Sequence, residues 1–340
     1  MKKTAIIGGG ASGLICAIFC ARKGVQVDLY EQNSKCAKKI LVSGNGRCNI
    51  TNKNLSPNDY FSQNPSFVEF ALREFGFVAF ERFCESMGLL LDVKDDGRVY
   101  PLSNEAKSVA SLLLSHAKNL GVIIHTDRKI SDIKKLFSEY DAVVIATGSE
   151  AAPHLGGNRD GLEFAETLGH NIIQTYPSLV QLHLNSSTPK KMSGAKLDGE
   201  VTLLINNKKE MTSSGDILFS DYGVSGFAVL DISQGASVAL SEGAHVSISL
   251  NLLPTFNAQK LANHISKMAE LEPEITLFEI LIGLIPSKIA LGILEELNSA
   301  SSLCGDAIGI KLAKKVANQL LNWRFEVTDT HGFRHAEVAG

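Results

Sequence analysis

Cysteine is scarce in this sequence, and none of its six cysteines forms a pair with Cys-x-x-Cys spacing. Small secreted domains that depend on disulfide bonds carry a much denser set of cysteines. Zinc ribbons and thioredoxin-like redox sites both need the close pairing that is missing here. The sequence therefore excludes a disulfide scaffold, and we expect no metal site.

An excess of charge of either sign is also missing. The 340 residues carry 33 Lys and Arg against 36 Asp and Glu, which gives a formal net charge of −3. Disorder requires low hydrophobicity together with high net charge, whereas 44% of this chain is hydrophobic. Proteins that are held on nucleic acid by bulk electrostatics are strongly basic. We therefore expect a folded protein of two or three domains, without nucleic acid as a partner; the oligomeric state is left open.

Long uninterrupted apolar runs are absent as well. The uncharged stretch 4–21 follows two lysines, as in a signal peptide, but four glycines interrupt its centre. A second apolar stretch, 280–294, contains Pro286 and Lys288 and is typical of a buried helix pair rather than a membrane span. These features predict a cytoplasmic protein with no membrane partner.

What the sequence does contain is a glycine-rich turn between a short apolar run and a predicted helix. Residues 3–7 are typical of a buried strand, the turn fits G-x-G-x-x-G, and Glu31 ends the next apolar run. In dinucleotide-binding folds, the glycines permit the tight turn, the approach of a pyrophosphate and close helix packing, while the acid accepts ribose hydroxyls. A glutamate here favours FAD or NAD over NADP. The predicted nucleotide site comprises Gly8, Gly10, Ala11, Ser12, Gly13, Glu31 and Gln32.

The segment 38–52 is polar and rich in glycine, where a typical NAD dehydrogenase continues with an ordinary helix. Such a loop indicates close backbone approach to a second part of the ligand, as FAD requires. Arg47 is a candidate for a pyrophosphate or ring contact, with a surface salt bridge as the alternative. Cys48 raises the alternative of a disulfide reductase, but a buried structural thiol is the favoured interpretation. The predicted flavin-side residues are Lys39, Ser43, Gly44, Asn45, Arg47, Cys48 and Asn49.

This loop resembles the signature of the aminoacetone oxidase family of NAD(P)/FAD-dependent oxidoreductases, and the resemblance extends over nearly the whole chain. Further elements that resemble the family are 97–101, 141–148 and 218–226. The resemblance implies an α/β fold: a Rossmann-like FAD-binding domain of the two-dinucleotide-fold flavoprotein type, with an inserted β-rich barrel-like domain and a nested helical domain. It also implies FAD contacts by the Ile130 backbone, Thr147 and Gly148. Arg98 and Tyr100 become catalytic candidates for the substrate pocket, with packing at the edge of the fold as the alternative.

The order of helical and strand-like patterns suggests where these domains lie. We expect the FAD-binding domain over 1–177, the β-rich domain over 178–252 and 322–340, and the helical insert over 253–321. Within the first domain, apolar spacing predicts one helix over 64–85. Compared with the family, the chain also stops before a segment that closes the flavin sheet, so it resembles a family member truncated at its C-terminus.

The leading functional hypothesis is a flavin enzyme that moves a hydride between NAD(P)H, FAD and a small organic substrate or oxygen. Two alternatives stay open. One is an RNA-modifying flavoprotein, since related FAD proteins act on tRNA, although only scattered lysine pairs such as Lys314-Lys315 would supply a basic face. The other is a non-catalytic FAD-binding protein, because the segment that closes the flavin sheet in the family is absent from this chain.

Overall fold

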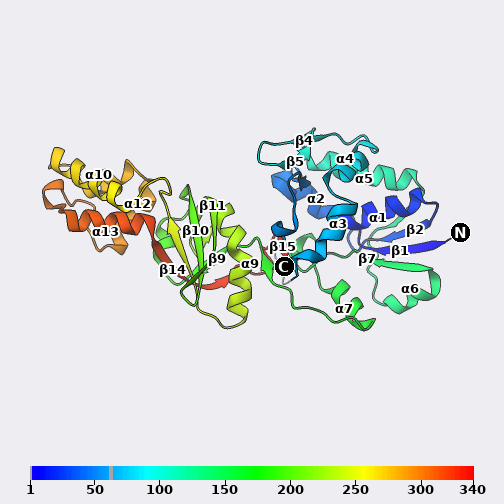
Figure 1. Ribbon diagram of the computed structural model, residues 1–340. Coiled ribbons are helices and arrows are strands. Elements are labelled where there is room, and N and C mark those ends of the chain that lie inside the picture. Colours follow the sequence, from blue (N-terminus) through cyan, green and yellow to red (C-terminus); the bar gives the residue numbers. More distant parts are fainter. Residues whose placement is uncertain (1, 61–63) are drawn as a thin grey trace. The chain divides into compact units, whose positions relative to one another are not determined.

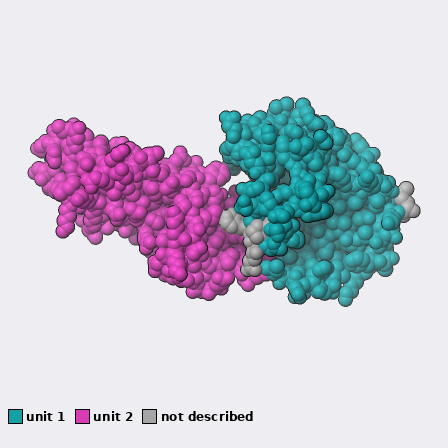
Figure 2. All heavy atoms as spheres, viewed as in Figure 1, with its two compact units in different colours: residues 1–173 teal, residues 174–340 magenta. Residues whose placement is uncertain are grey.

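The computed structural model describes residues 2–60 and 64–340, and it divides into two compact units, Met1–Ile173 and Gln174–Gly340 (Figure 2). Each unit has its own hydrophobic core. The two units are described separately below.

The first unit is built on a parallel sheet with the strand order β6-β2-β1-β7. Helices α1 and α5 share a core with one face of this sheet, and α6 contributes to a smaller core with the strands. Parallel strands covered on both faces are almost wholly apolar, which explains why the run 3–7 is recognisable in the sequence. The strands are β1 (Lys3–Ile7), β2 (Gln26–Tyr30), β6 (Ile123–His125) and β7 (Ala142–Ile145).

A small antiparallel sheet, β3-β5-β4, lies in the long segment between β2 and α5 (Figure 1). Its strands are β3 (Thr51–Asn52), β4 (Leu91–Val93) and β5 (Arg98–Pro101). The helices of the first unit are α1 (Ala11–Arg22), α2 (Lys38–Val42), α3 (Glu69–Glu74), α4 (Phe77–Glu85), α5 (Ala106–Asn119), α6 (Ile133–Glu139) and α7 (Asp160–Thr167).

The single helix expected over 64–85 is wrong, because the chain breaks between α3 and α4. Phe75 leaves helical geometry (φ −139°, ψ 53°), and Gly76 is the extended N-cap of α4. Phe67 and Phe70, which precede the break, point outward, with 81% and 65% of their surface exposed. Apolar spacing alone missed the break because glycine lies inside an otherwise helical pattern.

The second unit contains a closed barrel with the strand order β10-β11-β12-β9-β14-β13, in which every neighbouring pair is antiparallel. The barrel-like domain predicted from the sequence is therefore confirmed. Its strands are β9 (Leu182–Leu184), β10 (Lys196–Ile205), β11 (Lys208–Ser220), β12 (Gly223–Ser225), β13 (Val246–Asn251) and β14 (Trp323–Thr330). A separate pair joins β8 (Pro177–Ser178) to β15 (Val338–Ala339).

Helices of the second unit lie on two sides of the barrel (Figure 1). Helix α9 (Phe227–Ser241) buries one stripe against the barrel strands, and α8 (Thr188–Lys191) is a short turn. The other helices lie in sequence between β13 and β14: α10 (Ala258–Leu271), α11 (Leu277–Ile282), α12 (Ser287–Glu296) and α13 (Ile310–Leu321). Pro286 separates α11 from α12, so the apolar stretch 280–294 forms the buried helix pair that the sequence predicts.

One hydrophobic core runs through the barrel and the helical segment without interruption. It joins barrel residues such as Leu203 and Phe219 to helical residues such as Ile265 and Ile293, all almost fully buried. The barrel and the helices therefore form one compact unit. The finer boundaries at 177, 252 and 321 stay a prediction.

Over residues 2–60 and 64–340, no helix combines the length and the apolar character needed to cross a membrane. The cytoplasmic location stays a prediction from the sequence.

Candidate functional site

The first turn of α1, directly after the glycine turn, has backbone amides with no intrahelical acceptor. The Gly8 amide donates to the Tyr30 carbonyl (2.8 Å), which ties the turn to β2, and Gly10 is the N-cap of α1. Because glycine has no side chain, the N-cap residue offers no side-chain acceptor to the amides of the first helical turn. These amides and the helix dipole together favour an anion at this point.

The three glycines of the motif have different surroundings. A Cβ atom at Gly8 would lie 2.3 Å from the carbonyl oxygen of Ala146, and one at Gly13 would lie 1.9 Å from that of Gly8. At Gly10, a Cβ would meet nothing within 4 Å. The outer glycines are therefore required for backbone packing, while the middle one leaves open space beside the amides. This is the division of roles that a bound pyrophosphate requires.

Glu31 lies directly after β2 and is buried, with 7% of its surface exposed. One carboxylate oxygen accepts the Gly9 amide (2.9 Å), and the other accepts the backbone and side-chain nitrogens of Asn33 (2.8 and 2.6 Å). The carboxylate thus fixes the glycine turn against the end of β2. It also lines the adjoining cavity, where a ribose hydroxyl can donate to it.

A cavity of about 260 Å³ lies at the carboxyl ends of the parallel strands. Open α/β sheets bind ligands in this position. The structure brings together ten of the residues predicted for the nucleotide and flavin contacts. They are Gly8, Gly10, Ala11, Ser12, Glu31, Gln32, Lys39, Ile130, Thr147 and Gly148. Gly13 lies behind them, packed against Gly8.

Several cations around this cavity were missed by the sequence analysis. Lys35, Lys38, Arg128 and Lys129 line it together with Lys39. Lys38 donates to the side-chain oxygen of Asn33 (2.8 Å). A cationic rim suits a phosphate-bearing ligand. The lysines near Glu31 could have been found from their proximity in sequence, whereas Arg128 and Lys129 arrive only because β6 pairs with β2.

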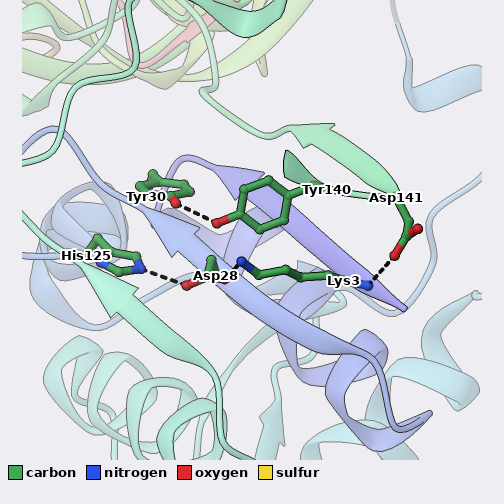
Figure 3. Close-up of polar contacts among 6 residues, drawn as sticks. All are labelled: Lys3, Asp28, Tyr30, His125, Tyr140 and Asp141. Atoms are coloured by element: carbon green, nitrogen blue, oxygen red, sulfur yellow. Dashed lines mark hydrogen bonds and ion pairs between the residues drawn. The ribbon is translucent and has the colours of Figure 1, made fainter. Parts of the chain in front are cut away.

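A polar network lies on one face of the parallel sheet (Figure 3). Asp28 lies between His125 (2.8 Å) and Lys3 (3.5 Å), and the hydroxyls of Tyr30 and Tyr140 are 2.6 Å apart. Burial alone would raise the pKa of the Asp28 carboxyl, but hydrogen bonds from His125 and Tyr140 and the Lys3 charge lower it below its usual value. Since Tyr30 lines the nucleotide cavity, this network holds one wall of the site.

The predicted flavin-side loop has an unusual backbone. Gly44 (φ 57°), Asn45 (φ 56°) and Cys48 (φ 62°) all adopt left-handed geometry within five residues. A Cβ at Gly44 would lie 2.7 Å from the Asn49 amide nitrogen. Non-glycine residues with such geometry store strain and cluster at functional sites. The Arg47 guanidinium caps this turn by donating to the Gly44 carbonyl (3.3 Å).

A second cavity of about 320 Å³ lies next to this loop. Ser43, Cys48 and Asn49 line it, and it shares Ala11, Lys39 and Ile40 with the nucleotide cavity. Gly44, Asn45 and Arg47 line neither of these two cavities. The loop therefore lines the second cavity, whereas the glycine turn lines the first.

The thiols around these cavities remain protonated at neutral pH. Burial raises the pKa of Cys36 to about 11, and the nearby Glu31 carboxylate adds to the effect. Burial also raises the pKa of Cys48, although a hydrogen bond with Ser43 opposes this. A disulfide reductase needs a reactive thiolate beside its flavin, so these surroundings favour the interpretation of Cys48 as a structural thiol.

Arg98 and Tyr100 lie on the same face of β5 but differ in burial. Arg98 is exposed and forms an ion pair with Asp96 (2.6 Å), and this partner, with a smaller effect of Tyr100, raises the pKa of the guanidinium. The Tyr100 ring is 5% exposed and lies under the Arg47 guanidinium at 5.3 Å. Neither residue lines the two cavities described above. Their catalytic role stays a prediction.

Histidines that are far apart in sequence meet in the second unit. The rings of His183 and His331 share a hydrogen bond of 2.7 Å, and Tyr222 lies 5.1 and 4.4 Å from their centroids. Burial and the neighbouring His183 lower the pKa of His331, while Asp221 opposes the shift. Sequence spacing missed this cluster because it forms through the pairing of β9 with β14.

The residues of the first cavity fit FAD. The open space at Gly10 and the free amides of α1 suit its pyrophosphate, the Glu31 carboxylate suits its adenosine ribose, and the cationic rim balances its charge. The loop 43–49 lines the adjoining second cavity, and its contact with the flavin stays a prediction. The geometry therefore supports a dinucleotide cofactor held in the first unit.

Comparisons with known proteins agree with this geometry. The 3-dehydro-bile acid delta(4,6)-reductase of Clostridium scindens is 30% identical over 355 residues, covering 99% of this chain and 86% of the relative. The ribosomal RNA dihydrouridine synthase of Haemophilus influenzae is 28% identical over 354 residues, covering 98% and 84%. A flavocytochrome c3 fumarate reductase structure covers 96% of this chain and 66% of its own, with a TM-score of 0.37 and 14% identity. That structural match is too weak for an inference about chemistry.

The family described as the HI0933-like protein Rossmann domain matches residues 2–292, which is most of the chain. That match includes the glycine turn, the acid after β2 and the polar loop, which are the features that form the dinucleotide site. The chain belongs to the HI0933-like family of Rossmann-fold, FAD-dependent oxidoreductases.

Proposed function

We propose that this protein transfers a hydride from NAD(P)H, through FAD, to a carbon–carbon double bond conjugated to a carbonyl in a small organic molecule. The observation that carries the proposal is the nucleotide cavity with its open amides at Gly10 and its buried acid at Glu31. The substrate class is supported by the relatives' names. One is a delta(4,6)-reductase, and the other makes dihydrouridine, in which one ring double bond next to a carbonyl is saturated.

The reaction balances as NAD(P)H plus enone plus a proton, giving NAD(P)⁺ plus the saturated ketone. FAD, when bound, supplies the two-electron carrier between donor and acceptor. The chain's own residues bind and orient it: the α1 amides hold the pyrophosphate and Glu31 holds the ribose. We assign the proton for the α-carbon to solvent, because the candidate donor Tyr100 and its neighbour Arg98 line neither cavity. Burial keeps Cys36 and Cys48 protonated at neutral pH, so neither thiol competes as a nucleophile for the enone.

The test uses the purified full chain. We expect a yellow protein that releases FAD, and anaerobic NADH or NADPH oxidation that depends on cyclohex-2-enone. The saturated ketone cyclohexanone is the matched control and should leave the rate unchanged. Oxidation that requires oxygen and ignores the enone would instead identify oxygen as the acceptor. A colourless protein that takes up no FAD would contradict the proposal.

A second candidate is reduction of uridine in RNA. It is favoured by the match to the ribosomal RNA dihydrouridine synthase over 98% of this chain. Lys311, Lys314 and Lys315 lie exposed on α13 and would supply part of a phosphate-binding face. Dihydrouridine formation in ribosomal RNA, together with RNA binding that weakens steeply with salt, would support this candidate over small enones.

A further inference from the structure

The second cavity differs in chemistry from the nucleotide cavity that it adjoins. Four separate segments line it: α1, the segment 39–50, α4 with the turn after it, and α5. Its walls are almost entirely apolar, and its volume of about 320 Å³ is within the range of small-molecule sites. The apolar wall comprises Ile15, Ile40, Ile50, Phe80, Phe83, Met87, Leu89, Val109 and Leu113.

Two aromatic rings on α4 form one wall of this cavity. The Phe80 and Phe83 rings are 6.3 Å apart and tilted by 38°, and Phe83 is stacked on Phe19 at 4.9 Å. Packing on both neighbours fixes the orientation of Phe83. Fixed aromatic faces are suited to a flat ring system, which buries area against them without ordering a flexible wall.

Few polar side chains line the second cavity, and one of them lies where the two cavities meet. Lys39 lies at this junction, and within residues 2–60 and 64–340 its ammonium has no hydrogen-bond or ion-pair partner. Partial burial lowers the pKa of Lys39. Ser43 and Asn49 are the lining residues with neutral polar side chains. A ligand in this cavity therefore meets mostly apolar walls, with the Lys39 ammonium as a donor at the junction.

The two thiols in the cavity do not change its apolar character. Burial raises the pKa of Cys84 to about 12, with Glu81 and Glu85 adding to the effect, and burial also raises that of Cys48. Both are therefore uncharged at neutral pH and act as small apolar groups.

We propose that this cavity binds the apolar ring body of the substrate, a cyclic enone whose carbonyl accepts a hydrogen bond from Lys39 at the junction with the nucleotide cavity. The inference rests on the proposed function for the identity of the substrate. The junction carries the argument: the shared residues Ala11, Lys39 and Ile40 place the carbonyl end of such a ligand beside the dinucleotide. The apolar walls accept the rest of the ring system.

The test fills the cavity with a larger side chain. Val109 on α5 lines the cavity and is 5% exposed, so Val109→Phe places a ring in the space that the substrate would use. Val78→Phe is the matched control, because Val78 lies on α4, is 58% exposed and lines neither cavity. The bicyclic enone octalone is the probe, and its binding is measured by saturation-transfer NMR, which needs no turnover.

We expect Val109→Phe to weaken octalone binding at least tenfold, with FAD content unchanged, and Val78→Phe to bind as the parent does. Val109→Ala enlarges the cavity without a risk of clash, and it should shift preference from octalone toward a tricyclic enone. Equal octalone binding by the parent and both Val109 variants would overturn the proposal. Binding that follows the proposal, without any enone-dependent NAD(P)H oxidation, would refute the proposed function and leave the cavity as a ligand site.

Discussion

The middle and last glycines of the turn are predicted to respond oppositely to substitution. A Cβ atom at Gly10 would meet nothing within 4 Å, and Gly10 has extended geometry (φ −80°, ψ −171°) as the N-cap of α1. Gly10→Ser is therefore expected to leave the stability of the FAD-free protein unchanged, or to raise it by a few tenths of a kcal/mol, because serine is a good N-cap. The serine hydroxyl would, however, accept hydrogen bonds from the α1 amides and fill the space that the pyrophosphate needs.

The loss of FAD affinity follows from the hydrogen bonds that the α1 amides would no longer donate to the pyrophosphate. Hydrogen bonds to a charged group contribute about 1.5–3 kcal/mol each. At about 1.4 kcal/mol for each factor of ten, losing one such bond weakens FAD binding roughly 10- to 150-fold. Gly10→Ser should therefore produce a stable protein that holds little FAD.

Gly13→Ala should behave in the opposite way. Its methyl would lie 1.9 Å from the Gly8 carbonyl oxygen, a backbone atom that cannot rotate aside. Overpacking costs up to about 3 kcal/mol, and alanine recovers about 1 kcal/mol of helix propensity, which leaves a net loss of about 2 kcal/mol. Urea unfolding of FAD-free protein measures the stability, and absorbance titration measures FAD binding. A Gly10→Ser protein that binds FAD within twofold of the parent would refute the reasoning.

Two further predictions concern buried titratable groups. Because the pKa of Asp28 is depressed in the folded protein, its carboxylate stabilises the fold at neutral pH, and that contribution is lost as the pH falls through the acid range below about 4. Asp28→Asn should lower the free energy of unfolding at pH 7 by about 1–3 kcal/mol and make that free energy fall less steeply as the pH is lowered. Urea unfolding at several pH values measures this, and a variant with the same pH dependence as the parent would contradict it. Burial raises the pKa of Cys48 and Cys84, so iodoacetamide at pH 7.5 should modify Cys304, which is only partly buried, before either of them. Mass spectrometry of the labelled peptides measures the order, and early labelling of Cys48 would show that the loop opens.

The sequence predicts the nucleotide turn well because its determinants are local. Glycine at fixed positions and an acid after the next strand are required by backbone geometry within one βαβ unit. The sequence does not predict Arg128 and Lys129 at the cavity, because they reach it only through the pairing of β6 with β2. These two strands are about a hundred residues apart in sequence. The exposure of Phe67 and Phe70 could not be predicted for a different reason. Apolar spacing shows that a helix has an apolar face, but it does not show whether another element packs against that face.

The position of the helical segment between β13 and β14 sets limits on how the second unit can be shortened. Leu250 and Trp323 are antiparallel partners, so the two ends of this segment are neighbours in the barrel and a tight turn could join them. Topology therefore permits its deletion. Packing opposes the deletion. The Trp323 ring packs closely against Gly292 of α12, where an added Cβ would lie 3.2 Å from it, and the core of the helices continues that of the barrel. A shortened chain would close its barrel and expose an apolar surface where the helices had been, which makes aggregation, rather than unfolding, the expected failure of such a deletion.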